Sequence, residues 1–400
     1  MLLVRTKAPS PLRSAGAVQK LRPICDYKTV RTLSTNQRGA EKKLVFVRRG
    51  FILPSPVVRP TFMRKLMLLS ALSLLAFGCR THTPQPAFDS TAAAVVAPAP
   101  PAPPAVAAKP LEAKTVYEMT PVEVGKFVAQ MQKEFSDLRP RVVAIARRNL
   151  GQKYSLHLLG EYPFEIHDGQ PLYCLENGDC VVFAEHVYAM ALSYDWQSFF
   201  AMLQRIRYKN GEISAVTRNH YTLADWNENN AWLIRDITPQ IAGGKTDTVT
   251  ENINRKAFFK KNFNVDVDVP NQSYTTTYVP GRFVKDVAAH LRAGDCVNVI
   301  RATKSGGKFC GHVGLITIGA DGTVNLLHST PPKSVEQPLM EYVEQQLEKN
   351  KERERKGEIT FQGLKFLRLE DDPVANLIKV DGPDAPIVTG PRGLLKKFSK

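Results

Sequence analysis

The chain has 400 residues and a formal net charge of +16 at pH 7. A chain of this length has room for about two or three domains, and a basic surplus ordinarily indicates binding to nucleic acid or to an anionic membrane surface. Most of the surplus lies in residues 1–62, however, whereas residues 111–400 are close to neutral. We therefore expect one folded domain and no nucleic-acid partner.

Residues 63–79 have the features of an export signal. A short basic head at Met63 precedes an apolar run of about a dozen residues, which ends at Gly78-Cys79 and is too short to span a bilayer. The segment before Cys79 resembles a bacterial lipobox but lacks its usual Leu, so a lipid anchor at Cys79 and ordinary signal cleavage are both open. Because the signal starts so late, we interpret residues 1–62 as a mis-annotated or disordered leader.

The export signal predicts a cell-envelope protein that is periplasmic or lipid-anchored to a bacterial membrane. Residues 80–114, which are rich in Pro and Ala, predict a semi-rigid linker. We expect the folded domain over residues 115–375 and a loosely ordered tail over residues 376–400.

Within the domain, helical patterns come first and strand patterns follow. Thr120, Pro121 and Glu123 form a helix start with a capping box. Further helices are predicted over 141–150, 180–192, 196–206, 281–291 and 338–356. Alternating patterns predict antiparallel strands over 297–302, 313–318 and 324–328, and a strand or hairpin over 359–369. This order predicts an α+β fold with helices packed on an antiparallel sheet.

Cys180 is the candidate nucleophile. Gly178-Asp179 is a helix-start signal, so Cys180 should lie in the first turn of an otherwise apolar helix. Unpaired backbone N–H groups and the positive end of the helix dipole lower the pKa of a thiol placed there. The alternatives are a buried, inert cysteine and a disulfide with Cys174.

Two histidines are candidates for the base. His312 begins one predicted strand and His328 ends the next, so a hairpin around residues 320–322 would place them opposite each other. One ring would take the thiol proton and the other would orient it by a hydrogen bond. His186 is closer in sequence, but six helical residues place it on another face and about 9 Å along the axis from Cys180.

Several motifs resemble a known family. Three segments of the chain resemble the signature segments of the NlpC-type papain-like superfamily of cell-wall cysteine hydrolases: DCVVFAE at 179–185, GDCV at 294–297 and HVGL at 312–315. Three more segments are similar to the N-acetylmuramoyl-L-alanine amidase-like family within that superfamily: LGQKY (150–154), IRYKNG (206–211) and RNHYTLADW (218–226). The resemblance covers roughly residues 120–375 in order.

This resemblance implies a papain-like fold with the nucleophile at a helix start, packed on the sheet that carries the histidines. It implies a triad of Cys180, His312 and His328, no metal or other cofactor, and hydrolysis of the bond between the muramic acid lactyl group and L-Ala. The partners would be peptidoglycan fragments (muropeptides). The alternatives are cleavage of the D-Glu–diamino acid bond and a non-catalytic lipoprotein that binds the wall.

A polar and aromatic segment, together with one residue upstream, predicts contacts with substrate. The candidates are Arg218, His220, Tyr221, Asp225, Trp226 and Tyr154. A guanidinium suits a muropeptide carboxylate, and an aromatic ring suits a sugar face. The competing interpretation is structural: Trp226 in the core, Arg218 paired with Asp225, and Tyr154 engaged in packing.

The remaining cysteines leave two further options. Cys296 and Cys310 flank a predicted hairpin and could form a disulfide in an oxidising compartment. Together with His312 they have the residue types of a zinc site, but the spacing matches no common zinc pattern and a fourth ligand is missing. We therefore expect no metal.

Overall fold

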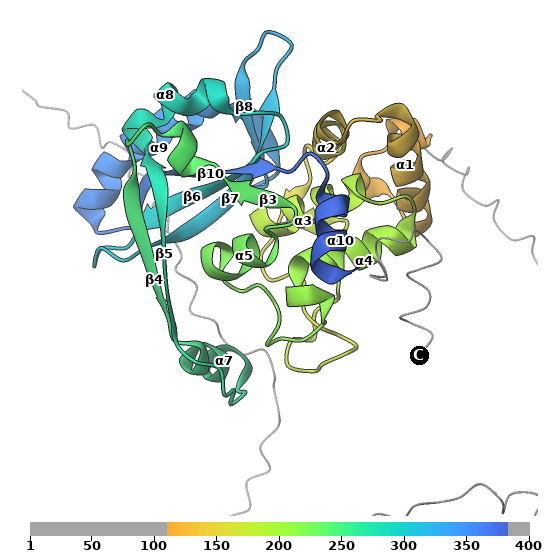
Figure 1. Ribbon diagram of the computed structural model, residues 1–400, viewed down its shortest axis with the longest axis horizontal. Helices are drawn as coiled ribbons and strands as arrows, with labels where there is room; N and C mark the ends of the chain where they lie inside the picture. The colour runs from red at the N-terminus through yellow and green to blue at the C-terminus, as the bar shows by residue number, and fades with distance from the viewer. Residues whose placement is uncertain (1–109, 383–400) are drawn as a thin grey trace, which may run out of the picture. The chain divides into compact units, whose positions relative to one another are not determined.

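The computed structural model describes residues 110–382, which form helices packed against an antiparallel sheet (Figure 1). The predicted α+β class is thereby confirmed. The longer helices of the first half are α1 (Pro121–Glu134), α2 (Leu138–Arg147), α3 (Cys180–Ala191) and α4 (Trp196–Arg207). Each lies within a few residues of a predicted helix.

Helix α1 shows how the sequence sets a helix start. The Thr120 side chain accepts a hydrogen bond from the Glu123 backbone N–H, and the Glu123 carboxylate accepts one from the Thr120 backbone N–H. Pro121 occupies the first helical position, where a missing N–H costs nothing. The capping box predicted for these residues is therefore present.

The main sheet is antiparallel, with the strand order β4-β5-β10-β6-β7-β8-β9, and β3 pairs with β10. The strands that the sequence predicted are β6 (Cys296–Ala302), β7 (Lys308–Ile318), β8 (Val324–His328) and β10 (Thr360–Leu369). Those that it missed are β3 (Ile234–Asp236), β4 (Asp247–Ile253), β5 (Gln272–Pro280) and β9 (Val335–Pro338). A short parallel pair, β1 (Lys153–Tyr154) and β2 (Asn177–Gly178), lies outside this sheet.

Each face of the sheet contributes to its own hydrophobic core, because successive side chains of a strand point to opposite faces. Leu315 and Leu327 belong to the core shared with α1 to α4. Ile316 and Leu326 belong to the second core. That core includes residues of α8 (Val284–Val287) and α9 (Leu339–Lys356).

A long hairpin formed by β4 and β5 carries helix α7 (Arg255–Phe263) at its tip, away from the helices of the first half (Figure 1). Its strands are rich in Thr, and most of their side chains stay at least partly exposed. The hydrophobic alternation that marks a half-buried strand is therefore weak, which explains why the sequence did not reveal this hairpin.

Two sequence-based expectations are wrong in detail. The helix predicted over 281–291 is broken into short pieces: η5 (Gly281–Phe283), α8 and η6 (Ala288–His290). Residues 376–381, predicted as loosely ordered, lie in helix α10 (Pro373–Asp381), whose Leu377 is fully buried in the main core. Asp381 also binds the Arg205 guanidinium at 2.8 Å.

The predicted leader, the signal with Cys79, most of the linker and residues 383–400 lie outside the described residues. At the inner end of the predicted linker, residues Leu111–Ala113 form a single 3-10 turn, η1, and Leu111 packs against the main core. Between residues 110 and 382, no helix combines the length and apolar composition needed to cross a membrane.

The burial of Leu377 predicts that α10 stabilises the domain. Leu377→Ala should lower the free energy of unfolding by about 2–5 kcal/mol, because it leaves a cavity in the main core. Val380→Ala, at a residue that is 63% exposed on the same helix, is the matched control and should change it by less than about 0.5 kcal/mol. Urea denaturation of the two variants checks this, and equal effects would show that α10 does not pack as described.

Candidate active site

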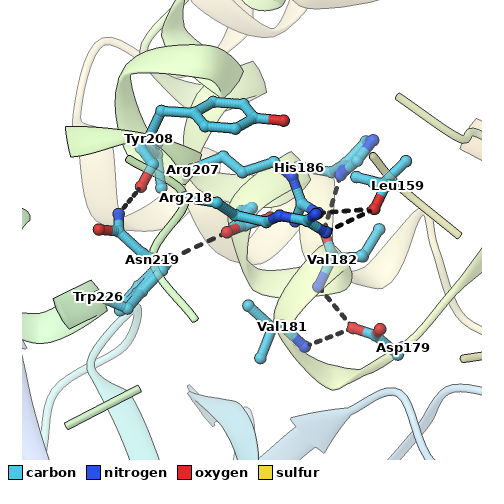
Figure 2. A network of polar contacts seen from close by, with 12 residues as sticks. Leu159, Asp179, Val181, Val182, His186, Arg207, Tyr208, Arg218, Asn219 and Trp226 are labelled. Carbon is cyan, nitrogen blue, oxygen red and sulfur yellow. Dashed lines mark hydrogen bonds and ion pairs between the residues drawn. The ribbon is translucent and has the colours of Figure 1, made fainter. Parts of the chain in front are cut away.

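Cys180 is the first residue of helix α3, where the sequence placed it. The helix is capped by Asp179, whose carboxylate accepts hydrogen bonds from the backbone N–H groups of Val181 (3.0 Å) and Val182 (2.8 Å) (Figure 2). These two donors are therefore occupied. The Cys180 backbone N–H lies within reach of its own thiol and is not used by the cap.

Helix α3 contacts strand β7, whose first half has no partner strand on the side of β8 among the described strands. Strand β8 ends at His328, and its ladder with β7 begins at Leu327, which faces Leu315. Among the described strands, none continues this ladder beyond His328, and α3 contacts both β7 and β8 here. The backbone of Val313 opposes the rise in the pKa of the Cys180 thiol, which places this part of β7 close to the start of α3. The nucleophile candidate thus lies next to the backbone that carries His312.

The two candidate histidines contact each other directly. His312 Nε2 lies 2.6 Å from His328 Nδ1, and the rings meet edge to face with centroids 4.9 Å apart. The second nitrogen of His328, Nε2, is 3.1 Å from the side-chain amide nitrogen of Gln337. Both rings are buried, and Tyr342 of α9 packs edge-on against His328.

The pairing of the rings agrees with the sequence-based expectation, but its register does not. Extension of the ladder places Gly314, rather than His312, opposite His328. The imidazoles therefore meet diagonally, with His312 two residues along β7 from the position opposite His328. Because Gly314 has no side chain, the His328 side chain can lie over it; a Cβ on residue 314 would lie 3.1 Å from the Cβ of His328.

The pKa of the thiol is opposite to the sequence-based expectation. Burial and the adjacent Asp179 carboxylate raise the pKa of Cys180 to about 12, although backbone N–H groups oppose this effect. Burial, together with His328 and the Arg301 charge, lowers the pKa of His312 well below its usual value. At neutral pH the free protein therefore holds an uncharged thiol and an uncharged imidazole.

His186 has the structural role expected of it. It is 5% exposed, its Nδ1 lies 2.7 Å from the Val182 carbonyl oxygen, and its ring packs against Phe199. Burial lowers its pKa to about 4, so the ring is neutral at physiological pH.

Arg218 is already paired within the protein. Its guanidinium binds the carboxylates of Glu161 at 2.8 Å and Asp168 at 3.0 Å. It also donates to the Leu159 carbonyl oxygen (Figure 2). A substrate carboxylate would have to displace these partners. The alternative pairing with Asp225 is also absent from the described contacts, because Asp225 binds Arg255 at 2.5 Å.

Trp226 lies in the main core and is 1% exposed, so its ring has no face available to a sugar. Its indole N–H donates to the buried carboxylate of Glu185, which also binds Arg207 at 3.1 Å. This buried network joins α3 to α4 and to the segment around Trp226.

His220 and Tyr221 connect the same segment to helix α7. His220 packs among Phe258, Phe259 and Phe263, and its Nε2 lies 2.6 Å from the Ala215 carbonyl oxygen. Burial and the Arg218 charge lower the pKa of His220 to about 3. The ring of Tyr221 lies under the Arg255 guanidinium. These contacts describe packing rather than an open binding surface.

Tyr154 lies within electrostatic range of Cys180. It is half-buried, and burial, followed by the charge of an ionised Cys180, raises its pKa. A cavity of about 530 Å³ lies instead beside Arg218, Asn219 and Gln272, and neither Cys180 nor the two histidines line it. Among the candidates, His312 contacts His328 and Tyr154 lies within electrostatic range of Cys180, whereas the polar side chains of the 218–226 segment have partners of their own.

A family model described as "N-acetylmuramoyl-L-alanine amidase-like" matches residues 144–348, which is half of the chain and includes Cys180, His312 and His328. The chain belongs to this amidase-like family. Of the solved structures, a protein from Legionella pneumophila is similar with 20% identity and a TM-score of 0.55, over 64% of this chain and 95% of that one. That likeness shows a shared fold.

An N-acetylmuramoyl-L-alanine amidase from Bacteroides uniformis is 20% identical, with a TM-score of 0.44 over 59% of this chain and 98% of that one. No curated protein matches the sequence.

In this member of the amidase-like family, Cys174, Cys180, Cys296 and Cys310 are all free thiols. The suggested bridge between Cys296 and Cys310 is not formed, because Cys296 faces Leu315 and Cys310 faces Ile300 in the ladder. In the part of the chain that the structure describes, no group of three or more His, Cys, Asp or Glu side chains is placed to hold a metal ion.

Sequence reasoning missed Arg301, Gln337 and Tyr342. Tyr342 and Gln337 touch His328, and the Arg301 charge acts on His312. The sequence offered one signal, since Arg301 is the only charged residue of strand β6. Gln337 and Tyr342 carried no comparable signal, because the short strand β9 and the inner face of the charged helix α9 become apparent only in three dimensions.

The role of Asp179 predicts the effect of one substitution. In Asp179→Asn, an amide oxygen still caps α3, but the negative charge that raises the pKa of Cys180 is gone. The rate of iodoacetamide modification of Cys180 at pH 8 should rise by several-fold, up to roughly tenfold. Peptide mass spectrometry measures the rate at each cysteine, and Cys174 is the internal control. An unchanged or lower rate at Cys180 would show that the carboxylate does not act on the thiol.

Proposed function

We propose that the protein is a cell-wall cysteine amidase with an NlpC-type papain-like arrangement, which cleaves the bond between the N-acetylmuramic acid lactyl group and L-Ala in muropeptides. Membership of the amidase-like family supports the reaction class. The observation that supports the mechanism is the contact between His312 and His328, with His312 on strand β7, which contacts the helix α3 that begins at Cys180. These are a nucleophile, a base and a group that orients the base.

In the proposed acylation step, His312 takes the thiol proton as the sulfur of Cys180 attacks the amide carbonyl carbon. His312 Nε2 is bonded to His328, so Nδ1 is the nitrogen that accepts this proton. In this proposal the Cys180 backbone N–H, which the Asp179 cap leaves unused, donates to the developing oxyanion. Because the pKa of Cys180 is raised to about 12, proton transfer accompanies the attack rather than preceding it.

The tetrahedral intermediate collapses when His312 returns the proton to the leaving L-Ala nitrogen. The C–N bond breaks, the peptide leaves with a free amino group, and the lactyl group remains as a thioester on Cys180. Water then attacks the thioester while His312 accepts its proton. Release of the muramic acid carboxyl group and return of the proton to sulfur restore the free enzyme.

This cycle requires one tautomer of the histidine pair. For Nδ1 of His312 to accept, Nε2 must carry the proton and donate to His328 Nδ1, and His328 must then be protonated on Nε2. The amide nitrogen of Gln337 is the atom nearest that position, at 3.1 Å. The tautomer therefore requires the Gln337 amide to turn over and present its oxygen.

We also propose that the protein is exported and meets its substrate in the cell envelope. The signal-like segment at 63–79 and the Pro-rich residues that follow it support this. A lipid anchor at Cys79 is part of the proposal. Intact-mass measurement of the protein purified from its native host tests it, since a diacylglycerol-modified Cys79 at the mature N-terminus has a mass that plain cleavage cannot give.

Digestion of a defined N-acetylmuramoyl tripeptide tests the proposed function. The amidase reaction yields free N-acetylmuramic acid and an intact peptide, which mass spectrometry distinguishes from the sugar-linked dipeptide that a D-Glu–diamino acid endopeptidase would release. Cys180→Ala should reduce turnover by at least roughly a thousandfold, whereas Cys174→Ala, the matched control, should keep it. Binding of the fragment without turnover by the wild type would instead indicate a wall-binding protein.

The low pKa of His312 gives the proposed enzyme a characteristic pH profile. The base must be neutral to accept a proton, and burial, His328 and Arg301 lower the pKa of His312 well below 6.5. The ring therefore stays neutral as the pH falls from about 7.5 to 6, and kcat/KM should be nearly constant over that range. It should decrease only at lower pH. An acid limb centred at or above pH 6.5 would contradict this assignment of the base.

A further inference from the structure

Arg301 lies on the same face of the sheet as the histidine pair. Val299 faces His312 in the ladder between β6 and β7, and Arg301 follows two residues later on β6, so its side chain leaves from the same face. Its neighbours across the two ladders are Phe309 and Phe361. The strand register thus places the Arg301 side chain on the face of the sheet that carries His312.

The arginine side chain runs over Gly311, the residue directly before His312. A Cβ on Gly311 would approach the Arg301 Nε to 3.1 Å and would overlap its Cδ. Gly311 lies at the point where the ladder shifts register, between the Cys310 and His312 pairs. The absence of a side chain here is what allows the guanidinium to lie beside the residue that carries the base.

Arg301 has no carboxylate partner among the described residues, and its buried Nε has no hydrogen-bond acceptor. Six other arginines with little exposure are paired with carboxylates: Arg139, Arg205, Arg207, Arg218, Arg255 and Arg368. The buried Arg141 has no carboxylate but is held by Gln132 and the Phe135 carbonyl oxygen. A buried charge without a counter-ion is costly, and this cost is removed when an anion binds.

A second cation reinforces the local positive charge. Arg353 of α9 donates to the Gln346 side-chain oxygen at 3.0 Å and has no ion pair among the described residues. Burial lowers the pKa of Arg353, and the Arg301 charge lowers it further. The two cations therefore lie within electrostatic range of each other. The Tyr342 hydroxyl lies within electrostatic range of Arg301, Arg353 and Cys180.

We propose that Arg301 binds a carboxylate of the substrate next to the scissile amide and so makes the enzyme selective for acidic stem peptides. The group we assign to it is the free α-carboxylate of the D-Glu that follows L-Ala in a muropeptide. A guanidinium binds a carboxylate through two parallel hydrogen bonds, which fixes position as well as charge. This inference rests on the proposed amidase function and adds a substrate determinant to it.

Electrostatic neighbours place this subsite near the nucleophile. An ionised Cys180 raises the pKa of both Tyr154 and Tyr342, whereas the Arg301 charge lowers both, against the larger effect of burial. The thiol and the guanidinium therefore both lie within electrostatic range of the same two hydroxyl groups. A substrate that presents its amide to Cys180 would bring the carboxylate of the next residue toward Arg301.

Two N-acetylmuramoyl tripeptides test the proposal, one with D-Glu and one with D-isoglutamine, whose α-carboxylate is an amide. The wild type should have a kcat/KM roughly 10- to 100-fold higher for the acidic substrate, the range expected of a charge-assisted contact. In Arg301→Gln the two values should become equal through loss on the acidic substrate, and Arg301→Lys should keep part of the preference. Lys304→Gln, which removes an exposed cation from the same hairpin, should retain the wild-type ratio.

Calorimetry with Cys180→Ala provides a readout that does not depend on turnover. This variant should bind the acidic tripeptide more tightly than the amidated one, and the double variant with Arg301→Gln should bind both equally. If this holds but the wild type cleaves neither substrate, the proposed amidase function fails and the carboxylate subsite stands. Equal binding of both tripeptides by Cys180→Ala, no binding of either, or an equal loss on both substrates in Arg301→Gln, would overturn the subsite.

Discussion

The site depends on the hydrogen bond between His312 Nε2 and His328 Nδ1, and that bond depends on the register of β7 against β8. A slip of one residue would turn one ring to the opposite face of the sheet. Hydrophobic packing holds this register from both sides, because Leu315 and Leu327 are buried under the N-terminal helices and Leu326 lies in the core under α9. The geometry of the polar pair is therefore set by the two apolar cores.

Burial decides the chemistry of the site more strongly than the helix dipole. The dipole at the start of α3 favours a thiolate, but the Asp179 carboxylate that caps the same helix opposes it, and desolvation adds to that opposition. Desolvation also keeps His312 uncharged. The result is a neutral pair whose proton moves when a carbonyl group is present to receive the sulfur. The free protein is thereby less exposed to unproductive reactions of a thiolate.

How much the sequence could predict depended on whether a feature was local. The cap at Thr120, the start of α3 at Cys180 and strands β6 to β8 follow from residues close together in the chain, and these predictions agree with the structure. Non-local features were missed. The register of the β7–β8 hairpin was misplaced by two residues, and the apolar alternation of the exposed, Thr-rich hairpin of β4 and β5 was too weak to reveal it. The partners of Arg218 come from residues 161 and 168. The residues next to a polar side chain in the sequence do not reveal whether it finds hydrogen-bond or ion-pair partners within the fold.

That distinction between satisfied and unsatisfied charge separates scaffold from site in this molecule. In the buried pair of Glu185 and Arg207 each charge has a counter-ion, and Glu185 is also bonded to Trp226, so the pair holds α3 against α4 and the Trp226 segment. Arg301 has the opposite character, since its charge lies next to the base with no counter-ion among the residues described. The free protein bears this electrostatic cost, and a carboxylate that arrives with the substrate removes it. Part of the substrate's binding energy is therefore available at the point where the amide must be held against the thiol.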